Sequence, residues 1–173
     1  MNLGIKNKIF CVVMLSVFFM TMLVVFVGCS EDNVMEVAHF SDMSSVGSKA
    51  YSVKVVIDEE SKLKNKSIDV QILSSVSDLE IAINLEGQSP KNISLPKENR
   101  WYSLTEFFAE EKVEFTKFET AENLQYILKV NKSADVSFRV VAGEAVEASD
   151  GGQLLANSEM ISNIFTKKME KFE

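Results

Sequence analysis

The residue types that most often act as nucleophiles or metal ligands are scarce in this chain. Among 173 residues there are two cysteines and one histidine. Cys11 and Cys29 both occur in the first 29 residues, so disulfides, catalytic thiolates and cysteine metal ligands are excluded from the rest. His39 lies in a polar, serine-rich segment, which is a poor setting for a catalytic base. We therefore expect no serine–histidine triad, no metal site and no cofactor.

Carboxylates are the one plentiful residue type with catalytic potential. Acidic runs occur at 58–60, 110–111 and 144–150. Calcium-loop spacing, phosphate-binding glycine loops and the H-E-x-x-H motif are all missing. Two carboxylates about 5 to 9.5 Å apart would suffice to hydrolyse a glycan, although the 124 residues from Ala50 onward are few for such a cleft. We expect a protein that is not an enzyme, with a carboxylate-based glycan hydrolase as the weaker alternative.

One cluster of aromatic and basic residues has the chemistry of a binding surface. Flat rings beside a polar group stack on sugars or anchor a protein partner. The candidate binding residues are Arg100, Trp101, Tyr102, Phe107 and Phe108. Neighbouring strand residues point to opposite faces, so only one of Trp101 and Tyr102 can be buried. The alternative is that these rings belong to the core.

The N-terminal segment has the composition of a targeting signal or a membrane anchor. Residues 1–8 carry Lys6 and Lys8, and residues 9–27 contain no charge. A basic segment followed by an apolar one is the layout of a secretory signal. Nineteen residues at about 1.5 Å each also approach the roughly 30 Å of bilayer hydrocarbon, so a retained membrane anchor is the alternative.

The end of the apolar stretch decides between these two. It reads Val27-Gly28-Cys29 and is followed by Ser30-Glu31. This resembles the lipobox of bacterial lipoproteins, with Phe26 at the position where that family usually has leucine. The resemblance implies cleavage at the Val27, Gly28, Cys29 site by lipoprotein signal peptidase, and a diacylglycerol on Cys29, which becomes the first mature residue. The family of the mature domain is not evident.

The net charge and the N-terminal segment together indicate which classes of partner to expect. After residue 28 the chain holds 16 basic and 25 acidic side chains, a net charge of −9, with no basic stripe. Phosphate binding needs clustered Lys and Arg, so we expect no nucleic-acid partner. The expected partners are a membrane, through the lipid anchor, and a protein or glycan of the envelope. The outer membrane or cell surface is the favoured location, and the inner membrane is the alternative.

Hydropathy alternates with a period of two after residue 50, which is typical of antiparallel strands. Pro90 and Pro96 flank one strand, which predicts that it lies at a sheet edge. The strands at 124–130 and 136–140, joined by turn residues, are expected to form a hairpin. The eight expected strands centre on 53–57, 68–72, 79–85, 93–95, 101–104, 113–115, 124–130 and 136–140.

A second period appears near the C-terminus. Apolar residues recur there at spacings of three and four between Met160 and Phe172, which predicts an amphipathic helix over 157–172. We therefore expect a mainly β protein, an antiparallel β-sandwich or barrel of about eight short strands with a C-terminal helix. The expected organisation is a signal peptide (1–28), a lipidated cysteine with a flexible tether (29–49) and a globular domain (50–173).

These features predict a lipid-anchored envelope lipoprotein that presents a non-catalytic β-domain for binding or structural interaction. A lipocalin-like carrier is the alternative, because eight strands followed by a helix resemble that family's layout. The Gly-x-Trp signature of lipocalins is absent from the first strand, since the lone tryptophan is Trp101. A carrier would need an internal apolar cavity, whereas a binding module would have a filled core and an exposed patch.

Overall fold

The computed structural model describes residues 37–43, 50–58, 63–85, 88–117 and 124–172. The chain divides into two units, 1–33 and 34–173, and every described residue belongs to the second. The predicted signal peptide, its cleavage site and the lipidated Cys29 therefore lie outside the described residues. In the described part of the chain, no helix is both long and apolar enough to cross a membrane.

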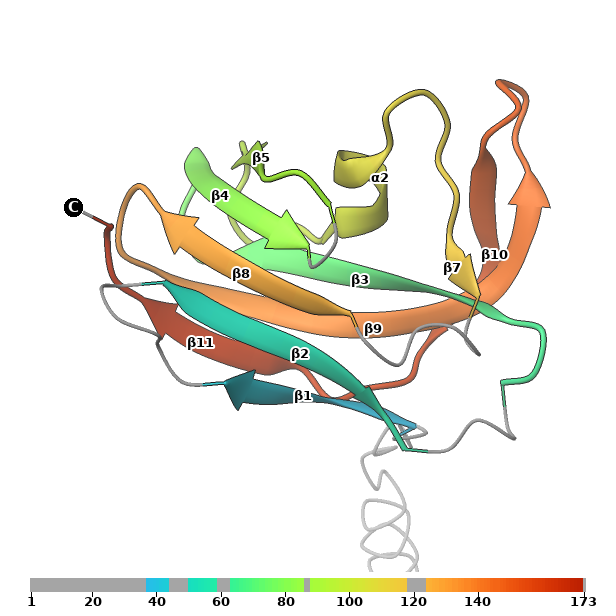
Figure 1. Cartoon of the computed structure of the whole chain (residues 1–173), viewed down its shortest axis with the longest axis horizontal. Coiled ribbons are helices and arrows are strands. Elements are labelled where there is room, and N and C mark those ends of the chain that lie inside the picture. The colour runs from blue at the N-terminus through green and yellow to red at the C-terminus, as the bar shows by residue number, and fades with distance from the viewer. Residues whose placement is uncertain (1–36, 44–49, 59–62, 86–87, 118–123, 173) are drawn as a thin grey trace, which may run out of the picture. The chain divides into compact units, whose positions relative to one another are not determined.

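The domain consists of two antiparallel sheets and does not close into a barrel (Figure 1). Sheet A has the order β1-β2-β8-β4-β5, with bounds Ala38–Met43, Tyr51–Ile57, Gln125–Val130, Leu79–Leu85 and Lys91–Leu95. Sheet B has the order β10-β9-β3-β6, with bounds Gln153–Met160, Ala134–Glu147, Ser67–Ser74 and Tyr102–Ser103. Two further strands join sheet B, β11 (Phe165–Met169) beside β9 and β7 (Thr116–Lys117) beside β3. Between β6 and β7 lies a short helix, α2 (Leu104–Phe108).

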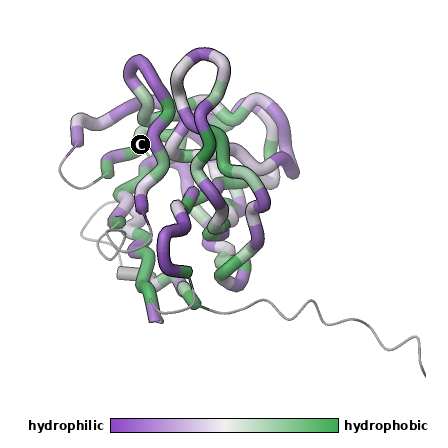
Figure 2. Tube along the Cα trace, turned by 90° about the vertical axis from the view of Figure 1, so that its right-hand side faces the viewer, coloured by the Kyte–Doolittle hydropathy of each residue, from purple (hydrophilic) through white to green (hydrophobic). Residues whose placement is uncertain are grey.

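A single core fills the space between the sheets. On β4 the buried Leu79, Ile81 and Ile83 alternate with outward-facing Glu80 and Ala82, as expected for a strand with one face in water. On sheet B the inward-facing pairs include Ile72 opposite Phe138 and Val70 opposite Val140, all fully or almost fully buried. Figure 2 shows hydrophobic and hydrophilic stretches alternating along the trace, with hydrophilic residues in the loops at the top of the view.

Three aromatic rings link the two sheets. Phe40 on β1 lies with its ring centroid 5.9 Å from that of Phe138 on β9 and 5.9 Å from that of Phe165 on β11. The start of β1 is also fixed by backbone hydrogen bonds, because the Val37 and Ala38 amides donate to the Ile161 carbonyl at 3.0 and 3.1 Å. The first strand is thus an integral part of the core.

This first strand corrects the predicted domain boundary. Residues 38–43 fall in the range 29–49, where a flexible tether is expected, yet they form six register pairs with β2. The alternation that marks other strands is weak here, because serines and acids surround Phe40. The folded domain therefore begins before residue 50.

The mainly β class and the sandwich are confirmed, and so is the edge position of the strand between Pro90 and Pro96, which is β5. The predicted hairpin is wrong. β8 pairs with β2 and β4 in sheet A, whereas β9 pairs with β3, β10 and β11 in sheet B. Residues 131–133 therefore connect the two sheets, a distinction that alternation alone does not encode. In the described residues there are eleven strands, compared with the eight expected.

The predicted C-terminal helix over 157–172 is also wrong. This segment holds the end of β10 and the whole of β11, which pairs with the first five residues of β9. Phe165 and Met169 face the core, while Ile164, one of the residues that defined the helical spacing, is 52% exposed. The 14-residue β9 extends beyond its pairing with β3. Its other edge forms backbone hydrogen bonds with β11, and this pairing overrides the local helical preference of the segment.

One glycine permits the close packing of β9 on β10. A Cβ atom at Gly143 would lie 2.6 Å from the Ala156 carbonyl oxygen and 3.1 Å from the Ser158 Cα. The contact is with backbone because β10 bulges between Ala156 and Glu159, where Asn157 has a φ of 49°.

We therefore expect Gly143→Ala to lower the free energy of unfolding by about 1 to 3 kcal/mol, as overpacking does elsewhere. Urea denaturation followed by circular dichroism measures this change. Ala145→Ser, at an exposed position on the same strand, is the control and should change stability by less than about 0.5 kcal/mol. Equal stability of the two variants would show that β10 yields to the added methyl group.

Candidate functional site

Three of the five predicted binding residues belong to the framework of the domain. Tyr102, Phe107 and Phe108 are partly buried and pack against the core. The Tyr102 and Phe107 rings lie 6.1 Å apart, and the Phe108 ring lies 6.5 Å from that of Tyr126 on β8. The Tyr102 hydroxyl also accepts a hydrogen bond from the Lys97 amide at 3.1 Å. The local reason is α2, the helical turn that carries both phenylalanines.

The other two predicted residues, Arg100 and Trp101, do not belong to the core cluster. The Arg100 guanidinium lies 5.4 Å from the centre of the Tyr102 ring. Trp101 lies under the guanidinium of Arg139, which is 4.4 Å from the Trp101 ring. Trp101 lies just before β6 and Tyr102 is the first residue of that strand, and both side chains are half-buried, so the expectation that one of the two is buried is not met. Arg139 on β9 was not among the candidates, because its position beside Trp101 arises from pairing across sheet B.

Arg139 belongs to a polar network on the outer face of sheet B. Its Nε donates to the Gln71 Oε1 at 2.8 Å, and the Gln71 Nε2 donates to the Asp69 Oδ2 at 3.2 Å. The other Asp69 oxygen accepts a hydrogen bond from the Ser103 hydroxyl at 2.8 Å. Asp69 is 3% exposed, so its charge is surrounded by protein.

The pKa shifts in this network arise from burial and from interactions with neighbouring protein groups. Burial raises the pKa of Asp69, and hydrogen bonds from Ser103, Gln71 and Thr105 oppose that rise. Burial lowers the pKa of Arg139, and the charge of Asp69 opposes that change. The pKa of Tyr126 is raised, mainly by burial and also by the Asp69 charge. Because the hydrogen bonds of Asp69 lead to protein groups, we assign the network to fixing α2 against β3.

A cavity of about 230 Å³ lies beside α2. Its walls include Phe108 and Tyr126, and its rim includes Glu110, Lys112 and Glu114. This is below the roughly 300 to 1,000 Å³ usual for small-ligand sites. It is therefore not the apolar cavity of several hundred Å³ that a carrier would need.

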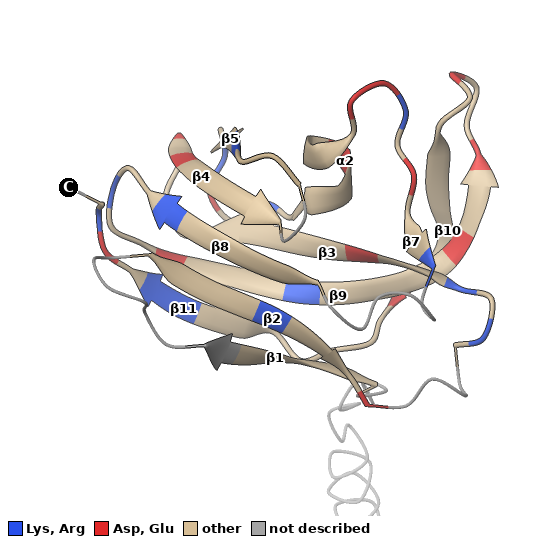
Figure 3. Ribbon diagram, viewed as in Figure 1, with Lys and Arg blue, Asp and Glu red and all other residues tan. Residues whose placement is uncertain are grey.

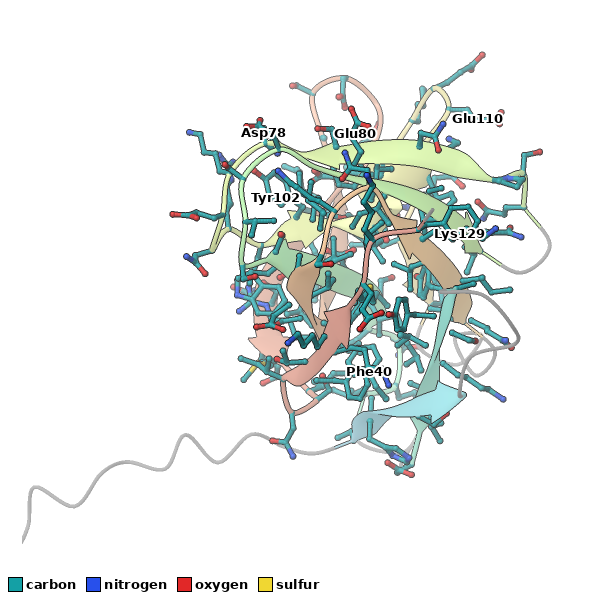
Figure 4. The ribbon with its side chains drawn as sticks, turned by 90° about the vertical axis from the view of Figure 1, so that its left-hand side faces the viewer. Phe40, Asp78, Glu80, Tyr102, Glu110 and Lys129 are labelled. Atoms are coloured by element: carbon teal, nitrogen blue, oxygen red, sulfur yellow. The ribbon has the colours of Figure 1, made fainter. Side chains whose placement is uncertain are left out.

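The larger hollow is an open groove of about 590 Å³, which we call the sheet A groove. It lies over the outward-facing side chains of β4, β5 and β8, near the chain's last described residues. Figure 4 labels its two charged residues, Glu80 on β4 and Lys129 on β8. The side chains that define it come from Glu80, Asn92, Ser94, Lys129, Asn131 and Phe172.

Two pairs of side chains give the groove its shape. At one pair, the Asn131 Nδ2 donates to the Glu80 Oε2 at 3.2 Å, and the Glu80 amide donates to the Asn131 Oδ1 at 3.1 Å. At the other, the Lys129 Nζ lies 4.3 Å from the centre of the Phe172 ring. Phe172 is held by its backbone, since its amide donates to the Val130 carbonyl at 2.8 Å. Phe172 as a residue remains 37% exposed.

The sequence carried little signal for this groove. Glu80, Lys129 and Asn131 appear in the sequence as ordinary polar residues of alternating strands and turns. The spacing of the apolar residues predicts that Phe172 lies on the apolar face of a helix, whereas its backbone lies along the end of β8, with Lys171 bridged to Val130. The one usable signal was the run of exposed polar positions on β5, an edge strand flanked by prolines.

Charge is unevenly distributed over the domain. Figure 3 shows acidic residues along the α2–β7 connection and the β9–β10 hairpin, at the other end of the sheets from the β8–β9 connection. Among the described side chains, no group of three or more His, Cys, Asp or Glu residues is arranged to hold a metal ion. His39 is hydrogen-bonded to Asp58, with its Nδ1 2.6 Å from the Asp58 Oδ2.

The chain matches no protein-family model, and comparisons with curated proteins and with solved structures likewise found no match.

Proposed function

We propose that this protein is a lipid-anchored lipoprotein of the bacterial envelope, whose β-sandwich is a non-catalytic binding module. The observation that carries the anchor is the sequence Val27-Gly28-Cys29 at the end of an uncharged stretch of 19 residues. A diacylglycerol on Cys29 buries enough methylene groups, at about 0.8 kcal/mol each, to hold an acidic domain at a membrane without a basic patch.

The features of the domain support a binding module over a carrier. The described core is packed with buried side chains from both sheets, and the larger hollow is open and lies outside it. The groove is lined by one described acidic residue, Glu80, whereas carboxylate-based hydrolysis needs two that face each other. An open groove with a filled core beneath it is suited to holding a ligand.

The early start of the domain gives the proposal a geometric consequence. Val37 is buried and is the first described residue of the domain, so at most seven residues, 30–36, lie between Cys29 and the described fold. A fully extended chain spans at most about 3.6 Å per residue, or about 25 Å in all. The module would therefore act close to the membrane surface.

The anchor is tested by mass spectrometry of the protein after expression of the full-length gene product in bacteria and purification from their membranes. We expect a mature N-terminal peptide that starts at Cys29 and carries the mass of at least two acyl chains. Metabolic labelling with an alkyne-bearing palmitate should mark the same peptide. A purified protein that retains residues 1–28, or an unmodified Cys29 thiol, would contradict the proposal.

A further inference from the structure

We propose that the sheet A groove binds a neutral sugar of an envelope glycan, with the Phe172 ring as its stacking platform. This inference rests on the proposed function of the domain as a binding module and names the ligand class of that module. It depends on three features of the groove, namely its hydrogen-bonding groups, its charge and its one exposed aromatic ring.

The hydrogen-bonding groups match a ligand rich in hydroxyls. Asn92 and Ser94 alternate with buried residues on β5, and their side chains are exposed at the groove. Amide and hydroxyl side chains both donate and accept, which is what a sugar hydroxyl also does. On the neighbouring strand β4, Glu80 lies opposite Ser94, and Asn131 holds the Glu80 carboxylate in place. A carboxylate has room for further donors on its two oxygens.

The charge of the groove favours a neutral ligand. Its described lining has one acidic residue, Glu80, and one basic residue, Lys129. The two formal charges cancel, so neither an anionic nor a cationic ligand gains a net electrostatic advantage. The ammonium of Lys129 already lies against the Phe172 ring, which leaves that cation partly compensated.

The apolar part of the lining is small. Ile81, Ile93 and Val130 also border the groove, but they are buried residues of the core. Phe172 is the large apolar side chain of the groove that is exposed in the described structure, at 37%. One exposed ring among polar groups suits the apolar face of a sugar ring better than an aliphatic chain or an amphipathic helix, each of which needs a continuous apolar surface.

The experiment measures binding of full-length protein, solubilised in detergent, to defined sugars. The probes are the neutral trisaccharides of glucose, mannose and N-acetylglucosamine, with trigalacturonic acid as the charged comparison, each titrated by calorimetry. Co-sedimentation with purified peptidoglycan tests a polymeric glycan. We expect saturable binding of at least one neutral sugar, with the acidic trisaccharide at least about fivefold weaker.

Variants separate an aromatic platform from a generic apolar contact. Phe172→Leu keeps apolar bulk but removes the ring, and should weaken binding about five- to tenfold, in line with the value of one aromatic contact. Phe172→Trp should keep or improve binding, and Asn92→Ala should weaken it. The matched control is Ile164→Ala, which shortens an exposed apolar residue outside the groove and should bind as the wild type does.

Three results would overturn the proposal. They are the absence of binding to every neutral probe, equal affinity of wild type and Phe172→Leu, and binding of extended peptides in place of sugars. The last would point to strand addition at the edge strand β5. Each result is independent of the acyl mass on Cys29, so a lipidated protein that ignores sugars would refute this inference alone.

Discussion

Replacing Cys29 with alanine is expected to abolish the mature, membrane-held form of the protein. Alanine has no thiol to accept diacylglycerol, and in lipoproteins the peptidase acts on the modified cysteine. The variant should therefore either accumulate as the longer precursor that retains residues 1–28 or appear in the soluble fraction. Fractionation of cells followed by immunoblotting distinguishes both products from the wild type, because the precursor migrates more slowly.

The matched control for this prediction is Cys11→Ala. Cys11 lies within the apolar stretch with no small residue immediately before it, so its loss should leave processing and fractionation unchanged. If Cys29→Ala remained in membranes with the mobility of the wild type, the 19-residue apolar stretch would be acting as the anchor. Its length of about 28 Å as a helix is sufficient for that role.

The regular alternation of the central strands made much of sheet A predictable. Leu79, Ile81 and Ile83 repeat with period two and lie in β4 with the bounds expected for them. Pro90 and Pro96 placed β5 at an edge for a reason that is local to the backbone, the missing amide donor. Such features depend on a few neighbouring residues, and the sequence displays them directly.

The strands that the sequence pattern missed depend on pairing with residues that are distant in the chain. β1 and β11 are short strands that pair with β2 and β9, and each brings one phenylalanine to the cluster around Phe138. Apolar residues near the C-terminus do have helical spacing, but this local preference is weak. Pairing with the free edge of the 14-residue β9 provides backbone hydrogen bonds that outweigh it.

The same distinction between local and distant signals applies to the candidate site. Sequence composition marked the aromatic cluster, and the structure then used three of its members as framework. The sheet A groove unites residues from β4, β5, β8 and the C-terminal segment, which are brought together by sheet order. No local motif connects Glu80 with Phe172, so a groove of this kind becomes visible only when the strands are placed.

Asp69 is the residue whose loss should destabilise the domain most among its polar side chains. Asp69→Ala would leave the Ser103 hydroxyl and the Thr105 donors without their buried acceptor and Arg139 without its compensating charge. Breaking such buried interactions costs about 3 kcal/mol or more. We expect a loss of that size in urea denaturation. Asp135→Ala, which removes an exposed carboxylate from the same sheet, should change stability by less than about 0.5 kcal/mol.

The pH dependence of stability gives a sharper test with Asp69→Asn, which keeps the shape of the side chain and cannot ionise. Burial raises the pKa of Asp69 in the folded state above its ordinary value of 3.8, so the folded protein binds this proton more tightly than the unfolded chain does. The Asp69 contribution to stability is therefore greatest below that ordinary value and declines as pH rises through the folded-state pKa. Tyr126, which senses the same charge, does not titrate in this range, because the ordinary pKa of a tyrosine, 10.0, already lies above it and burial raises the pKa further.

Subtracting the unfolding free energy of Asp69→Asn from that of the wild type, at each pH from 3 to 7, removes the contributions of all other carboxylates that the two proteins share. The difference should fall as pH rises and then level off once the folded-state carboxyl is ionised. A difference that rises with pH would mean that the hydrogen bonds from Ser103, Gln71 and Thr105 outweigh burial. Asp69 would then stabilise the domain as an anion, and Asp69→Asn would be most harmful at neutral pH.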